Sequence, residues 1–396
     1  MKRLLFQAVL FFAAVSLFSQ SVGAGGTLNT QHYAIVSESG AERAAEILSQ
    51  ELELRFDAYN RLFRFDPGSL REPLKVRVFI DPSAYDSYVS ARVGQTRPGA
   101  VYLHYNQQER RELLVCKGSA EEPSMLAHQA FVQYLRGFVS NPPAWMREGF
   151  AIYFSGIKFD PGAGILKYEE NLAWLEAVKS LGKDAPALRG IMEADFSALP
   201  VSSSFQICSW ALVSFLLNNG REDYFRTLVE TFMILSPQGA AQDNSREVLR
   251  RMDLWTDFTA MERDYAAYLD SRRTFADLME EGRRAYAAKD AVSAELCFMS
   301  ALDQRPTHYA PYYYLGLIYY EEKSYDMAEE YYKSSLEYGA DEALVSYALG
   351  VNALSAGRGA DAVSWLERAA ATDPARYQAR AAELINRLQE GARRTP

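Results

Sequence analysis

Residues 309–342 read YAPYYYLGLIYYEEKSYDMAEEYYKSSLEYGADE and form the middle one of three similar segments. Four columns of residues recur at a step of 34: a glycine column, an alanine column, a column of large apolar residues and a column rich in proline. Their members are Gly282, Gly316 and Gly350; Ala294, Ala328 and Ala362; Phe298, Tyr332 and Leu366; and Pro306, Ala340 and Pro374. A constant step of this length is typical of a helical-repeat protein, in which each unit packs on the next.

Two helices fit into each unit. The small residues allow close approach of the helices, the large residue packs between them, and the proline is expected to end the second helix. This pattern resembles the tetratricopeptide repeat (TPR). It predicts three units at 275–308, 309–342 and 343–376, and a capping helix completes a repeat domain that spans 273–392.

The TPR resemblance implies a concave groove that binds a peptide or protein segment and is lined by the first helix of each unit. The register places nine residues there: Met279, Arg283, Tyr286, Tyr313, Leu317, Tyr320, Tyr347, Val351 and Leu354. Such a groove is aromatic and apolar, without the Lys and Asn residues expected for gripping a C-terminal carboxylate. An alternative stays open, because these tyrosines could simply pack between the helices.

Residues 25–272 show a different pattern, with strand and helix signals alternating before a run of helices. Apolar alternation predicts strands at 32–39, 74–80, 100–105 and 112–117, with Val76, Val78 and Ile80 facing inward. Helices are expected at 122–139, 143–155, 168–181, 204–219, 222–236, 244–252 and 254–271. A small sheet followed by a helical lobe is an α+β fold.

Two segments of this region carry a motif: LAHQAFVQYL at 126–135 and PAWMREGFAIYF at 143–154. They resemble the peptidase MA-like domain of gluzincin-type zinc peptidases, which places His-Glu-x-x-His on one helix and a glutamate ligand on the next. The resemblance implies a metallopeptidase-like fold. It also implies that His128 and Glu148 occupy two of the three ligand positions.

The other two positions of the motif depart from the family. Gln129 stands where the general base belongs, and an amide cannot take a proton from water near neutral pH. Val132 stands where the second imidazole belongs, whereas catalytic zinc takes three protein ligands and a water. We therefore expect a pseudopeptidase without catalytic residues or a cofactor. The alternative is an active zinc metallopeptidase with an unorthodox site, using His128, Glu148 and another ligand, for which His104 is one candidate.

The ends and the composition of the chain restrict its partners. Lys2 and Arg3, an apolar run at 4–18 and small residues at 22–24 predict a signal peptide over 1–24, with an uncleaved anchor as the alternative. The net charge of −9 argues against nucleic-acid binding. A disulfide between Cys116 and Cys208 remains open.

Together these patterns predict an exported, non-catalytic scaffold or adaptor that binds a protein or peptide partner through its repeats. It is expected in the periplasm or cell envelope, or secreted, with no membrane span after signal cleavage.

Overall fold

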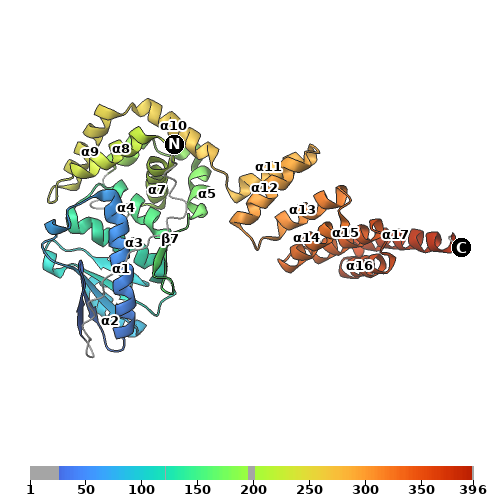
Figure 1. The fold of residues 1–396 in the computed structure, drawn as a ribbon, viewed down its shortest axis with the longest axis horizontal. Helices are drawn as coiled ribbons and strands as arrows, with labels where there is room; N and C mark the ends of the chain where they lie inside the picture. The colour runs from blue at the N-terminus through green and yellow to red at the C-terminus, as the bar shows by residue number, and fades with distance from the viewer. Residues whose placement is uncertain (1–25, 121, 195–200, 395–396) are drawn as a thin grey trace. The chain divides into compact units, whose positions relative to one another are not determined.

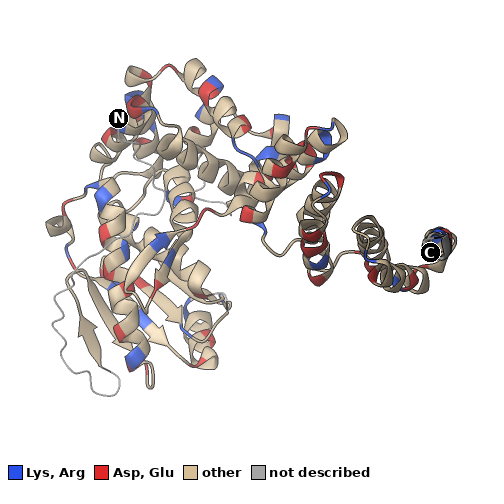
Figure 2. Ribbon diagram, turned by 45° about the vertical axis from the view of Figure 1, so that its right-hand side comes forward, with Lys and Arg blue, Asp and Glu red and all other residues tan. Residues whose placement is uncertain are grey.

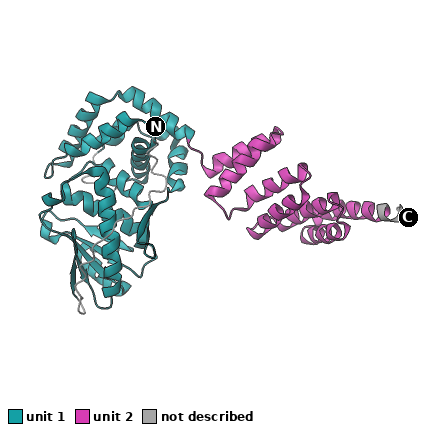
Figure 3. Cartoon of the chain, viewed as in Figure 1, with its two compact units in different colours: residues 1–271 teal, residues 272–396 magenta. Residues whose placement is uncertain are grey.

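The chain forms two units in the computed structural model, which describes residues 26–120, 122–194 and 201–394 (Figure 1). The predicted signal peptide lies outside the described residues. Contacts divide the chain into residues 1–271 and 272–396 (Figure 3). Acidic and basic residues are interspersed along the ribbon of both units (Figure 2).

The first unit contains, within its described residues, a five-stranded sheet in the order β1-β2-β3-β5-β4. The strands are β1 (Thr27–Asn29), β2 (Tyr33–Ser37), β3 (Leu74–Phe79), β4 (Ala100–Leu103) and β5 (Glu112–Cys116). β2, β3 and β5 run parallel, and the edge strands β1 and β4 run antiparallel to their neighbours. β1 escaped prediction because three residues are too few to show an alternation.

Helices pack on both faces of this sheet. α1 (Glu42–Phe63) and α3 (Glu122–Phe138) share one face, and α2 (Pro82–Val93) lies on the other. The bounds of α2 follow from its sequence. The side chain of Asp81 caps its start, with Pro82 at the first helical position, and Gly94 ends it in the left-handed region at φ 77°.

The two faces of β3 correct one sequence expectation. Val76 and Val78 are fully buried on the face of α1 and α3, as predicted. Ile80 is 43% exposed rather than inward-facing, because β3 ends at Phe79. Phe79 is buried instead, since α2 covers the second face and places Tyr85 5.6 Å from its ring.

Aromatic packing fixes α3 against α4 (Ala144–Ser155). The ring of Phe131 on α3 lies 5.2 Å from that of Tyr59 on α1 and 5.1 Å from that of Phe154 on α4. Trp145, at the start of α4, is fully buried. Because each aromatic pair adds about 0.5–1.5 kcal/mol beyond its buried area, this core holds the two helices of the sequence motif together.

A hairpin and six further helices complete the first unit. They are β6 (Ile157–Asp160), β7 (Ile165–Tyr168), α5 (Leu172–Leu181), α6 (Leu188–Glu193), α7 (Ser203–Asn218), α8 (Glu222–Met233), α9 (Ala241–Trp255) and α10 (Phe258–Ser271). The helix predicted from residue 168 begins only at Leu172, because Asn171 caps it through Ala173 N and the preceding residues pair with β6.

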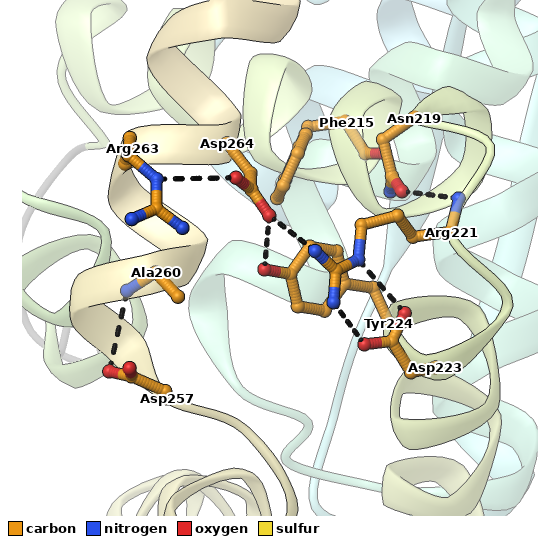
Figure 4. Close-up of polar contacts among 9 residues, drawn as sticks. All are labelled: Phe215, Asn219, Arg221, Asp223, Tyr224, Asp257, Ala260, Arg263 and Asp264. Carbon is orange, nitrogen blue, oxygen red and sulfur yellow. Dashed lines mark hydrogen bonds and ion pairs between the residues drawn. The ribbon is translucent and has the colours of Figure 1, made fainter.

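Polar contacts tie α10 to the turn between α7 and α8 (Figure 4). Asp264 on α10 accepts hydrogen bonds from Arg221 Nη1 and from the Tyr224 hydroxyl, each at 2.8 Å. Arg221 also binds Asp223 at 2.7 Å. The Arg221–Asp223 pair is exposed, so it adds little stability, whereas Asp264 is partly buried and Tyr224 is buried.

The second unit consists of paired helices. They are α11 (Phe275–Ala287), α12 (Ala291–Gln304), α13 (Tyr309–Glu321), α14 (Tyr325–Glu337), α15 (Glu342–Ser355), α16 (Gly359–Thr372) and α17 (Pro374–Arg394). α11 packs on α12, α13 on α14 and α15 on α16, and α17 packs on the last pair. The prediction of three repeated helix pairs followed by a further helix is confirmed.

The columns of the sequence mark the places where paired helices touch. A Cβ atom on Gly316 would lie 2.5 Å from the ring of Tyr332, which only glycine avoids. Gly282 with Phe298, and Gly350 with Leu366, repeat this contact at 2.7 Å. Pro306 and Pro374 lie two residues after the ends of α12 and α16, where a proline is expected to end the second helix of a unit, and Pro374 also begins α17. α14 ends without a proline, as Ala340 in this column implies.

Among the described residues, no helix is long and apolar enough to cross a membrane. Cys116 and Cys208 are free, buried thiols in separate hydrophobic clusters, so the disulfide that the sequence left open does not form.

Candidate functional site

α3 and α4 bring the two ligand-like residues of the motif near each other. Burial lowers the pKa of His128, and the nearby Glu148 carboxylate opposes that shift. Val132, one turn further along α3, packs against the hydrophobic core. The position that would need an imidazole is therefore part of the packing of the unit.

Glu148 has both carboxylate oxygens engaged. Arg147 Nε donates to its Oε1 at 2.8 Å, and Gln206 Nε2 of α7 donates to its Oε2 at 3.1 Å. Burial alone would raise the pKa of Glu148, but Arg147 and Gln206 hold it below the usual range. A metal at this carboxylate would have to compete with these two partners.

Gln129 has a structural partner as well. Its side-chain oxygen accepts a hydrogen bond from Tyr102 N at 3.1 Å. Tyr102 lies on β4, and this N–H points away from β5, the single strand that pairs with β4. Gln129 therefore satisfies a backbone donor of the sheet edge, which would otherwise be open to another strand.

Three arginines surround the end of β4; we call Arg111, Arg136 and Arg147 the arginine cluster. Arg111 precedes β5, Arg136 lies in the last turn of α3, and Arg147 lies in the first turn of α4. His104, which follows β4, is in their field: burial, then Arg136, Arg111 and Arg147, lower its pKa to about 3. Its Nδ1 is buried and has no hydrogen-bond partner among the residues that the structure describes.

The arginine cluster was not predicted from the sequence, although two signals point to it. Arg147 directly precedes Glu148 within the motif. Arg136 lies eight residues after His128, two helical turns along, and so shares a face with it. Gln206 had no sequence signal, because its role depends on how α7 packs against α4.

No group of three or more His, Cys, Asp or Glu side chains arranged to hold a metal ion occurs among the described residues. His104 lies beside the arginine cluster, whose positive charges repel a cation. Zinc binding through His128 and Glu148 has no third ligand of these types in the part of the chain that the structure describes.

The predicted groove residues form a second candidate site on α11, α13 and α15. Met279 is an exception, because it is only 6% exposed and packs in the core of the first pair. We call the remaining eight the repeat face: Arg283, Tyr286, Tyr313, Leu317, Tyr320, Tyr347, Val351 and Leu354. Arg283 is exposed and the other seven are half-buried.

Tyrosines of the repeat face connect successive repeats. Tyr286 OH donates to Glu321 at 2.5 Å, and Tyr320 OH lies 3.1 Å from the hydroxyl of Ser355. The two bonds are equivalent: one joins the C-terminal ends of α11 and α13, and the other joins the C-terminal ends of α13 and α15. These two hydroxyls thus bond to the neighbouring repeat, while both tyrosines are half-buried.

Comparison with known proteins gives matches among solved structures only. No family model and no curated protein matches it. A solved Arabidopsis OM64 TPR domain is similar at 16% identity and a TM-score of 0.28, over 29% of this chain and 94% of that one. The N-terminal domain of stress-induced protein-1 (STI-1) from C. elegans is similar at 21% identity and a TM-score of 0.26, over 29% of this chain and 92% of that one. The peptidase-like fold of residues 25–272 stays a prediction.

Proposed function

We propose that this chain is an exported, non-catalytic adaptor that binds a protein or peptide partner on its repeat face. The observation that carries the proposal is the recurrence of half-buried aromatic and aliphatic side chains at equivalent positions of α13 and α15, joined by Tyr286 on α11. Aromatic rings offer large contact areas at little cost in conformational entropy, which suits them to partner binding.

The first unit, in this proposal, is a pseudopeptidase. Gln129 lacks the basicity to activate a water and bonds to the sheet edge instead. Val132 is partly buried and packs against the core, and Glu148 is bound by Arg147 and Gln206. Export is proposed from the signal-like pattern of residues 1–24 alone.

Site-specific photo-crosslinking in cells tests the repeat face. A benzoylphenylalanine placed at Leu317 or Val351 samples this face. The matched controls are Val292 and Leu296 on α12, which are 69% and 64% exposed. We expect one discrete crosslinked protein from 317 and 351 and none from the controls. Equal products from all four positions, or no product from 317 and 351, would refute partner binding on the repeat face.

A metal measurement tests the pseudopeptidase part separately. The purified chain is loaded with zinc, dialysed and analysed alongside His128→Ala. We expect no zinc retained in stoichiometric amount. About one zinc per chain, lost in the variant, would instead refute the absence of a metal site and favour the metallopeptidase alternative, which requires a third protein ligand besides His128 and Glu148.

A further inference from the structure

The arginine cluster is unusual because two of its guanidinium groups have no acidic partner. Arg111 donates from Nε to Tyr105 O at 2.7 Å and from Nη1 to Arg136 O at 3.4 Å. Arg136 donates from Nη1 to Ser140 O at 3.0 Å. Among the residues that the structure describes, neither guanidinium forms an ion pair. Backbone carbonyls orient both groups but leave their charge unneutralised.

The charges of the site do not balance. Three guanidinium charges stand against one carboxylate, that of Glu148, so two positive charges remain. Glu72 lines a small hollow together with Arg111 but forms its ion pair with Lys75, at 3.2 Å. Partial burial of unpaired charge is costly, and a bound anion would relieve that cost.

The neighbours of Arg136 are consistent with this imbalance. Burial, followed by the charges of Arg147 and Arg111, lowers the pKa of Arg136 to about 10. His104 is neutral in the same surroundings, and its Nδ1 has no partner. A neutral imidazole can carry its hydrogen on Nδ1 and donate it to an oxyanion.

We propose that the arginine cluster binds a phosphate group, with Arg111 and Arg136 donating to its oxygens and His104 supplying a further donor. Guanidinium groups suit tetrahedral oxyanions because their planar N–H forks donate in pairs. A phosphate group carries close to two negative charges at neutral pH, which matches the two unbalanced positive charges. The site is independent of partner binding on the repeat face.

Calorimetric titration of the full purified chain with inorganic phosphate tests the site, at pH 7.5 and constant ionic strength set with chloride. We expect saturable binding that Arg136→Gln or Arg111→Gln weakens at least about tenfold, the loss typical of one charge-assisted contact. Arg110→Gln is the matched control: Arg110 is the adjacent exposed arginine, and it lies over the Tyr105 ring at 4.7 Å. Absence of phosphate binding, or equal weakening in Arg110→Gln, would overturn the proposal.

Other anions and a stability measurement sharpen the test. Sulfate should bind as phosphate does and acetate much more weakly; acetate binding of equal strength would overturn the assignment to a doubly charged oxyanion. Titration with glycerol 2-phosphate distinguishes a phosphate ester from free phosphate as the ligand of this site. Binding comparable to that of inorganic phosphate indicates a phosphate ester, and binding of inorganic phosphate alone indicates the free ion. Without phosphate, Arg136→Gln should melt no lower than the unaltered chain, whereas a purely structural arginine would lower the melting temperature on replacement.

Discussion

Replacing Gln129 tests whether this residue stabilises the sheet edge or is only a remnant of a catalytic position. In Gln129→Ala, Tyr102 N loses the acceptor that lies 3.1 Å away. In Gln129→Glu, the shape of the side chain and an acceptor oxygen are retained. If residue 129 serves the sheet, the alanine variant is impaired, the glutamate variant is not, and neither gains peptidase activity.

The size of the effect follows from the burial of this bond. A donor left unsatisfied in a dry interior costs about 1–3 kcal/mol, while a typical hydrogen bond contributes about 0.5–1.5 kcal/mol net. Tyr102 is half-buried, so water can partly replace the lost acceptor. We therefore expect Gln129→Ala to lower the free energy of unfolding of the first unit by about 1 kcal/mol.

Amide hydrogen exchange measures the loss of the Tyr102 N–H hydrogen bond directly. Exchange at Tyr102 should accelerate about fivefold in Gln129→Ala, the factor that corresponds to about 1 kcal/mol, and should stay unchanged in Gln129→Glu. Gln107→Ala, at an exposed position before β5, is the control. Unchanged exchange in Gln129→Ala, or equal acceleration in the glutamate variant, would contradict the anchoring role.

Three further predictions address other parts of the chain. Gly316→Ala should destabilise the second unit by about 1 kcal/mol in urea unfolding, because overpacking against Tyr332 costs more than the helix propensity gained; a gain in stability would show that the contact yields. Lys323→Gly should stabilise this unit by about 0.5–1 kcal/mol, because Lys323 has a left-handed φ of 64°, and an unchanged midpoint would contradict that strain. His104 should not titrate between pH 8 and 5 by NMR. The unfolded chain protonates this imidazole near pH 6.5, whereas the folded chain does so only near pH 3. The stability that neutral His104 contributes is therefore fully present above pH 6.5 and is lost progressively as the pH falls to about 3, so His104→Asn should lose less stability over this range. A His104 titration near pH 6.5 in the folded chain would contradict the effect of burial and of the arginine cluster on its pKa.

The repeats could be predicted because their packing is local and periodic. The spacing of Gly282, Gly316 and Gly350 reports a close contact that each unit makes within itself, so sequence distance encodes it directly. The role of the tyrosines could not be settled in the same way. The hydroxyls of Tyr286 and Tyr320 bond to the neighbouring repeat while both residues stay half-buried, and a register alone does not predict which contact a tyrosine makes.

The first unit was harder to predict because its contacts join distant segments. Alternation along β3 indicated two faces but not that α2 covers the second one, which decides that Phe79 and not Ile80 is buried. The arginine cluster likewise draws on segments before β5, at the end of α3 and at the start of α4. No single segment contains the charge imbalance.

The face of α3 that carries His128 differs in chemistry from the zinc-peptidase helix that it resembles in sequence. Val132 and Arg136 follow at one and two helical turns, so an aliphatic side chain and then a guanidinium stand on the face where a zinc peptidase needs a second imidazole. Glu148 still has a positive partner, but Arg147 supplies it from the adjacent position. A carboxylate paired with an arginine stays ionised without a metal. Because further arginines surround it, the local charge is positive rather than negative. Such surroundings repel a cation and attract an anion, so the same charges disfavour a metal ion at His128 and Glu148 and favour the proposed phosphate site.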